Sequence, residues 1–166
     1  MTVVSDTSPI SYLVLIGREE VIGELYGEVL VPEAVHRELV HPRGPEVVRE
    51  RTSNSPSWMK VEAAESDAGS LRRGEEQEGS LQDLDPGERE AILLAVRKEA
   101  DLLLIDERAG RAVARKRGIT VTGTIGVLGA AAQTGLVDPA KSVCDLRETT
   151  FRASADLYRW LLEKGQ

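Results

Sequence analysis

Two stretches of apolar residues, each ending at an aspartate, constrain the fold of this chain more than any other feature. Val3-Val4 leads through Ser5 to Asp6, and the uninterrupted run Leu102–Ile105 leads to Asp106. Apolar runs of this kind suit strands of a parallel sheet that is covered on both faces. Ligands of an open α/β sheet bind outside the carboxyl ends of its strands, so both aspartates are candidate site residues.

Segments with helical periodicity alternate with these and other apolar strands. Further strands are predicted at 28–31, 58–61 and 119–122, and helices at 8–16, 19–26, 32–39, 46–51, 85–100, 107–117, 123–133, from 137 and at 153–164. The alternation predicts an α/β domain with a mainly parallel sheet of four or five strands. Ser8 is expected to cap the first helix, with Pro9 at its first position. For Asp6, capping of this helix is an alternative to a site role.

The length of 166 residues is that of a single domain. Residues 63–83 are acidic and glycine-containing with few apolar side chains, and we expect a mobile insertion there. The single cysteine, Cys144, excludes an internal disulfide framework and a cysteine-based zinc site. With no signal-peptide pattern and no apolar run long enough to cross a membrane, the chain is expected to be cytoplasmic.

The formal net charge of −7 argues against binding of nucleic acid by bulk electrostatic attraction. It leaves room for an enzyme that gathers acids in a metal pocket and keeps a local basic strip. Such a strip is predicted after Asp106, where Arg108, Arg111 and Arg115 share one helix face. These arginines could bind RNA phosphates beside the acids, or they could form an ordinary solvated face.

Four acids are predicted to converge at one edge of the sheet: Asp6, Glu38, Glu88 and Asp106. Clustered carboxylates repel one another unless some are protonated or a cation neutralises them. Ligation by oxygen alone favours Mg²⁺ or Mn²⁺, and such ions support hydrolysis of phosphodiesters.

Several of these residues have alternative interpretations. Glu88 could instead close a capping box with Asp85. Glu90 could replace it as a ligand, although the two face about 200° apart on a helix and would not both bind one ion. Glu107 is interpreted as a charge at a helix start. Tyr158 and Trp160 could stack on bases, but their spacing beside Leu157 and Leu161 favours core or dimer contacts.

Four segments resemble the acidic motifs of PIN domains, in order and over nearly the whole chain. They are Asp6-Thr7-Ser8, the 32–39 helix with Glu38, Leu84-Asp85-Pro86-Gly87-Glu88 and Leu104-Ile105-Asp106. The stretches around Gly87-Glu88 and Thr122–Leu128 are similar to a prokaryotic PIN-like family related to VapC toxins. The third acid departs from the family pattern, because Glu88 stands where PIN domains commonly carry aspartate.

The resemblance implies a three-layer α/β/α fold and a Mg²⁺- or Mn²⁺-dependent endoribonuclease. Such a protein is often the toxin of a toxin–antitoxin pair, with a protein antitoxin as partner, and often a homodimer. By motif position, the metal-binding and catalytic acids would be Asp6, Glu38, Glu88 and Asp106. Ser8, with Thr7 and Thr124 as further candidates, would orient water or ligands.

Two other functions compete with this one. A PIN-fold module that has lost turnover would hold RNA or a protein partner. A phosphatase using Asp6 is disfavoured, because the haloacid type needs a second aspartate two residues on, where this chain has Ser8.

Overall fold

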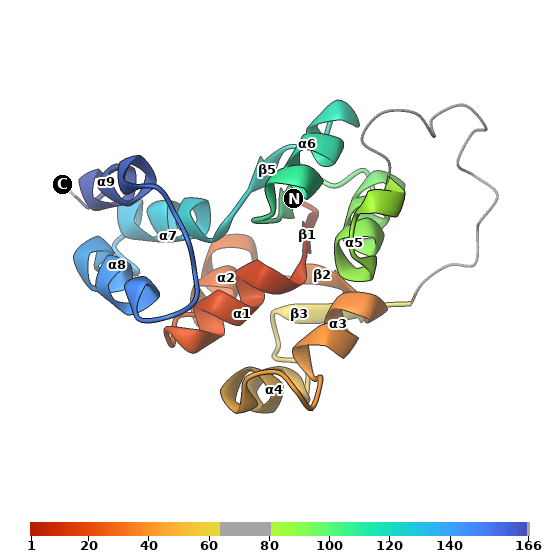
Figure 1. Ribbon diagram of the computed structural model, residues 1–166, viewed down its shortest axis with the longest axis horizontal. Helices are drawn as coiled ribbons and strands as arrows, with labels where there is room; N and C mark the ends of the chain where they lie inside the picture. The colour runs from red at the N-terminus through yellow and green to blue at the C-terminus, as the bar shows by residue number, and fades with distance from the viewer. Residues whose placement is uncertain (64–80, 166) are drawn as a thin grey trace.

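A computed structural model describes residues 1–63 and 81–165, and its centre is a five-stranded sheet (Figure 1). The strand order is β3-β2-β1-β4-β5, and every neighbouring pair is parallel. The strands are β1 (Val3–Ser5), β2 (Val29–Pro32), β3 (Met59–Glu62), β4 (Leu102–Leu104) and β5 (Val121–Thr122). The predicted parallel sheet is therefore confirmed, with five strands and a shorter last strand than expected.

Nine α-helices and one short 3₁₀ helix, Leu81–Asp83, lie in the described part of the chain. The α-helices are α1 (Thr7–Leu15), α2 (Glu20–Tyr26), α3 (Glu33–Leu39), α4 (Glu46–Thr52), α5 (Pro86–Arg97), α6 (Arg108–Lys116), α7 (Thr124–Gln133), α8 (Pro139–Arg147) and α9 (Ala155–Glu163). Each predicted helix is present, with ends that differ from the prediction by at most three residues. None of the described helices is long and apolar enough to cross a membrane.

Helices cover both faces of the sheet and make three layers. Val3 and Leu104 point to one face and join a core cluster with α1, α2 and α7. Val4 and Leu103 point to the other face and pack with α5 and α6. Successive side chains of a strand point to opposite faces, so the short apolar strands supply both cores. This is the predicted α/β/α arrangement.

The strand order places the two aspartates side by side. From β1 the chain builds outward through β2 and β3, and it then returns to add β4 and β5 on the other side of β1. Ser5 pairs with Leu104, and the Asp6 backbone N–H donates to the Leu104 carbonyl at 2.8 Å. Asp6 and Asp106 thus follow adjacent strands at the point where the order reverses, which is where ligands of such sheets bind.

Three sequence-based expectations need correction. The first helix begins at Thr7, so Asp6 and not Ser8 occupies the N-cap position, and Pro9 lies further into the first turn, where backbone N–H groups have no helical acceptor. On α9, Leu161 and Tyr158 are buried as expected, whereas Leu157 and Trp160 are substantially exposed. Of the expected 63–83 insertion, residues 64–80 lie outside the described residues, and Leu81–Asp83 are helical.

Candidate metal and nucleic-acid site

Asp6 is a buried carboxylate in which one oxygen atom lacks a hydrogen-bond partner. Its side chain is only 3% exposed, it makes no capping hydrogen bond to α1, and its Oδ1 atom has no hydrogen-bond partner in the described structure. Burial raises its pKa from 3.8 to about 8, a hydrogen bond from the Thr7 backbone N–H acts in the opposite direction, and the charges of Glu88, Asp85 and Glu38 add to the increase. The capping alternative is therefore not supported, because Asp6 occupies the N-cap position of α1 but its side chain makes no capping hydrogen bond.

Glu38 reaches the same place from α3. The Thr7 hydroxyl donates to Glu38 Oε2, which joins the carboxylate to the residue after Asp6. The Glu38 carboxylate also lies directly against the backbone of Gly87. A Cβ atom at Gly87 would stand 2.5 Å from Glu38 Oε1, so only glycine leaves room for this approach.

Glu88 forms the predicted capping box and also faces the acids. Its backbone N–H donates to Asp85 Oδ1 at 2.9 Å, and its Oε2 accepts from the Asp85 backbone N–H at 3.4 Å. The residue is 5% exposed, and burial, followed by the charge of Asp85, raises its pKa to about 7. The two interpretations of Glu88 are therefore compatible in one conformation.

Glu90 points elsewhere. Its Oε2 atom accepts from the backbone N–H of Ala34 at 3.3 Å and so satisfies a donor at the start of α3. It lines a separate small cavity with Pro32 and Arg97. Of the two glutamates, it is Glu88 that lies with Asp6.

An acidic cavity of about 370 Å³ brings three of the four predicted acids together. Its lining includes Asp6, Glu38 and Glu88, together with Thr7, Ser8, Asp83, Asp85 and Glu107. Glu107, which the sequence indicates only as a charge at a helix start, is therefore part of this cavity. Glu107 is the N-cap residue of α6, and its backbone is extended and not helical. Its place directly after Asp106, beyond the carboxyl end of β4, is the sequence signal that could have identified it.

Asp106 faces away from this cavity. Oδ1 accepts from the Thr124 backbone N–H at 2.7 Å and Oδ2 from the Thr124 hydroxyl at 2.8 Å, so the carboxylate caps the start of α7. Burial raises its pKa, while the Thr124 hydrogen bonds and the charge of Arg111 act in the opposite direction. The structure thus separates Asp106 from the other three acids, although it follows the adjacent strand.

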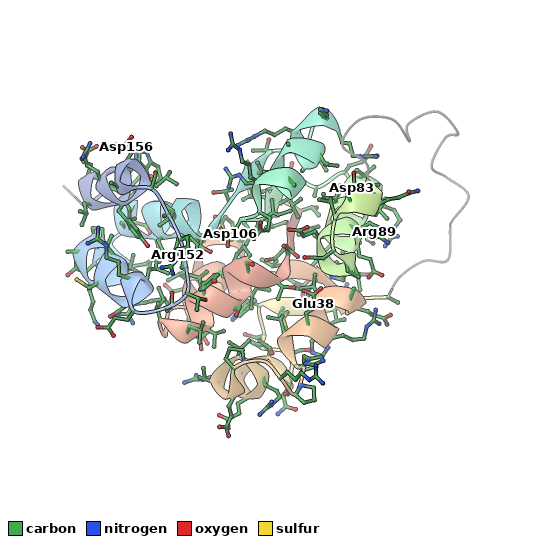
Figure 2. The ribbon with its side chains drawn as sticks, in the orientation of Figure 1. Glu38, Asp83, Arg89, Asp106, Arg152 and Asp156 are labelled. Carbon is green, nitrogen blue, oxygen red and sulfur yellow. The ribbon has the colours of Figure 1, made fainter. Side chains whose placement is uncertain are left out.

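Arg89 holds one wall of the acidic cavity in place. Its guanidinium donates to the carbonyls of Leu81 at 3.0 Å and Leu84 at 3.1 Å. These bonds tie the segment that carries Asp83 to α5 (Figure 2). The sequence does not indicate this role of Arg89, because backbone carbonyls are present at every position and leave no residue pattern.

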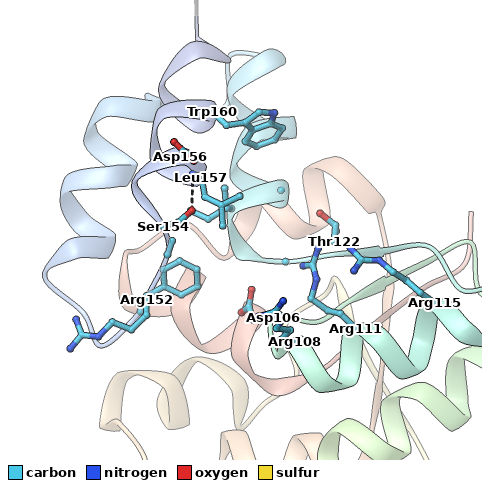
Figure 3. Close-up of a pocket in the computed structure, with 15 residues that line it drawn as sticks. Asp106, Arg108, Arg111, Arg115, Thr122, Arg152, Ser154, Asp156, Leu157 and Trp160 are labelled. Carbon is cyan, nitrogen blue, oxygen red and sulfur yellow. Dashed lines mark hydrogen bonds between the residues drawn. The ribbon is translucent and has the colours of Figure 1, made fainter. Parts of the chain in front are cut away.

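A basic groove of about 780 Å³ lies on the other side of Asp106 (Figure 3). The predicted strip Arg108, Arg111 and Arg115 lines it, with the exposed Leu157 and Trp160 of α9 opposite. Arg111 Nη1 donates to the Ile105 carbonyl at 3.2 Å. Burial, and then the charge of Arg115, lowers the pKa of Arg111.

The described acids supply the type of ligand atom that a hard divalent cation prefers, but their side chains are not arranged around one common point. Within the described residues, no three His, Cys, Asp or Glu side chains are arranged to hold a metal ion. The unpartnered Oδ1 of buried Asp6 is nevertheless the atom that a cation would satisfy, and the neighbouring donors are carboxylate oxygens. Carboxylates repel one another when no cation lies between them. Here the Glu38 carboxylate accepts a hydrogen bond from the Thr7 hydroxyl, and the Glu88 carboxylate accepts one from the Asp85 backbone N–H.

Comparison with known proteins gives one match. A family model described as a PIN domain matches residues 2–166. No curated protein matches the chain. No solved structure matches it either.

Proposed function

The chain belongs to the PIN-domain family, and from this premise we propose that it is an endoribonuclease that hydrolyses RNA with the help of Mg²⁺ or Mn²⁺. PIN domains are generally nucleases, which supports hydrolysis of a phosphodiester bond. The observation that carries the proposal is the carboxylate of Asp6, which is buried at the carboxyl end of the sheet with an unpartnered oxygen. A structural carboxylate would be paired or exposed, since burying an unpaired acid costs free energy.

Asp6, Glu38 and Glu88 would hold the cation in the acidic cavity. Asp106, at the adjacent strand end, is proposed as the fourth acid, on the side where the cavity gives way to the basic groove. When bound, a divalent cation lowers the pKa of water and stabilises the charge that develops on the phosphate.

The chain's own side chains supply the remaining functions. Thr7 orients Glu38 through its hydroxyl, and Thr124 orients Asp106 through two hydrogen bonds. Ser8 lines the acidic cavity, where its hydroxyl is proposed to orient water or a ligand oxygen. Glu88, whose pKa is raised to about 7 in the metal-free protein, would bind the cation as a carboxylate and release its proton when the cation binds. Arg108, Arg111 and Arg115 would bind phosphates of the RNA.

A toxin role with a protein antitoxin, a homodimeric state and a cytoplasmic location belong to the proposal as well. They rest on the resemblance to VapC-related proteins. Expression of the wild-type chain should arrest growth of a bacterial host, and the Asp6→Asn variant should not. Co-expression with a cognate antitoxin should restore growth.

The decisive experiment compares wild type and Asp6→Asn in a titration with Mg²⁺ or Mn²⁺. We expect the wild type to gain thermal stability and to cleave a mixed RNA pool, and the variant to do neither while remaining folded. A variant with full activity would falsify the assignment of Asp6. Cleavage by the wild type in excess EDTA would argue against a metal-dependent reaction.

A binding module without turnover is the second candidate. Two observations favour it: the described acids are not arranged to hold an ion, and both oxygens of Asp106 accept hydrogen bonds from Thr124. RNA binding without cleavage, in the presence of either cation, would support it.

A further inference from the structure

The acidic cavity and the basic groove share one short wall at the start of α6. Asp106 and Arg108 line the groove, whereas Glu107 and Ala109 line the acidic cavity. Side chains in this segment therefore alternate between the two spaces. A ligand bound in the groove would therefore lie next to the segment that also lines the acidic cavity.

The arginines of the groove are held in an electrostatically unfavourable arrangement. Arg108 is the first residue of α6, where the positive end of the helix dipole disfavours a cation. Arg111 and Arg115 follow on the same face, four residues apart, and like charges at this spacing repel. Burial and then the charge of Arg115 lower the pKa of Arg111, and the charge of Asp106, which also lines the groove, acts in the opposite direction. An anion between the guanidinium groups would relieve this repulsion in a chain whose net charge is −7.

The opposite wall carries two exposed apolar side chains, Leu157 and Trp160, beside the polar residues Arg152, Ser154 and Asp156. Leu157 is 48% exposed and Trp160 is 39% exposed, and Figure 3 shows both on the α9 side, across from the arginines. The indole packs against Gly129 of α7, where an added Cβ would meet the ring at 2.5 Å. Lys164 Nζ lies 4.6 Å from the ring centroid. Trp160 is therefore a positioned ring and not a freely rotating surface side chain.

The groove thus combines guanidinium groups, which can bind phosphates, with an exposed aromatic ring, which can stack on a base. We propose that the groove is a subsite for single-stranded RNA, in which the α6 arginines hold phosphates and Leu157 and Trp160 hold an unpaired base. Proteins that bind single strands combine a basic groove with an aromatic platform. A duplex keeps its bases stacked and paired, so the groove would select single strands. This inference rests on the proposed function for the identity of the ligand.

Binding is tested without metal, so that cleavage does not enter the measurement. The probes are a fluorescein-labelled single-stranded RNA of mixed sequence and its duplex, in EDTA, followed by fluorescence anisotropy over a range of salt concentrations. The groove variants are Arg115→Gln, Leu157→Ala and Trp160→Leu. Lys116→Gln and Leu162→Ala are matched controls, because both positions are exposed on the same helices and do not line the groove.

We expect Trp160→Leu to weaken single-strand binding at least about fivefold, the lower end of the loss of one base stack, with little effect on the duplex. Leu157→Ala should act in the same direction and tests the wall even if Trp160→Leu unfolds. Arg115→Gln should reduce the salt slope of log K by about 0.7 for one lost phosphate contact. Both controls should bind within about twofold of wild type.

Equal binding by groove and control variants would overturn the inference. So would equal affinity of the wild type for the single strand and the duplex. If the groove variants change the oligomeric state in size-exclusion chromatography and not RNA binding, the groove is an interface between copies. If the groove variants lose RNA binding but the wild type cleaves no RNA, the assignment of the groove stands. The proposed nuclease function is then refuted.

Discussion

The carboxylate of Asp106 accepts two hydrogen bonds from Thr124, one from the backbone N–H and one from the hydroxyl, at 2.7 and 2.8 Å. These bonds join the end of β4 to the first residue of α7, across 18 positions of sequence. They occupy both oxygens and turn the side chain toward the basic groove. The same contact therefore caps a helix and separates Asp106 from the other acids.

Substitution of Thr124 tests this relationship. Thr124→Val removes the hydroxyl, leaves Asp106 Oδ2 short of a donor, and should lower stability by about 1–2 kcal/mol. Thr124→Ser keeps the hydroxyl and should preserve cleavage. Chemical denaturation and RNA cleavage of both variants check the prediction, and equal activity of the Val and Ser variants would show that Asp106 needs no such positioning.

Glu88 and Glu90 form a matched pair on α5. Glu88→Gln should reduce metal-dependent cleavage at least about tenfold, because it removes a charge from the acidic cavity. Glu90→Gln keeps an oxygen acceptor for the Ala34 N–H and should stay within about twofold of wild type. Cleavage rates at saturating Mn²⁺ decide between them. The reverse pattern would make Glu90 the third acid.

The metal-free protein should lose stability as pH rises. Asp6 has an ordinary pKa of 3.8 when exposed and about 8 when folded, so the folded protein holds a proton that the unfolded chain releases. Glu88 acts in the same direction over a narrower range. The free energy of unfolding should therefore fall between about pH 4 and pH 8.

The Asp6→Asn variant is the control for that pH dependence. It removes the carboxylate, so at pH 8 in EDTA its Tm should exceed that of wild type by about 3 °C or more, and its pH dependence should be weaker. Calorimetry at several pH values checks both. If wild type and variant show the same slope of stability against pH, the raised pKa of Asp6 is wrong.

Gly87→Ala should separate stability from activity. Alanine favours the helix by about 1 kcal/mol, so the variant should fold at least as well as wild type. The new Cβ would collide with the Glu38 carboxylate, which must move, and cleavage should fall about tenfold or more. Thermal unfolding and cleavage assays are needed on the same sample. Unchanged cleavage would show that Glu38 need not lie against Gly87.

Local chemistry made several features predictable from the sequence. The capping box of Asp85 and Glu88 and the proline that starts α5 act within one helical turn, so the sequence pattern contains all of the interacting groups. The parallel sheet was predictable because its central strands, β1 and β4, are buried on both faces. Asp6 and Asp106 were recognisable as candidate site residues because each follows an apolar strand, and ligands of open sheets bind beyond the carboxyl ends of the strands.

Features that depend on distant segments were not predictable. Ser8 has the chemistry of a cap, yet the β1–β4 pairing sets where α1 begins and gives the N-cap position to Asp6. Trp160 has core spacing on α9, yet no described element covers it fully. Glu107 lies with the acids because the chain is extended there, and Asp106 does not because Thr124 binds it.

The sequence by itself determined which elements form and which acids follow the strands, because hydrogen bonding, helix capping and apolar periodicity act over a few residues. Only the tertiary structure decided which acids share a cavity, and which arginines meet an exposed tryptophan across a groove. Burial and side-chain direction depend on the segments that pack from far along the chain. A buried Asp6 with a raised pKa is the product of that packing, and no local pattern encodes it.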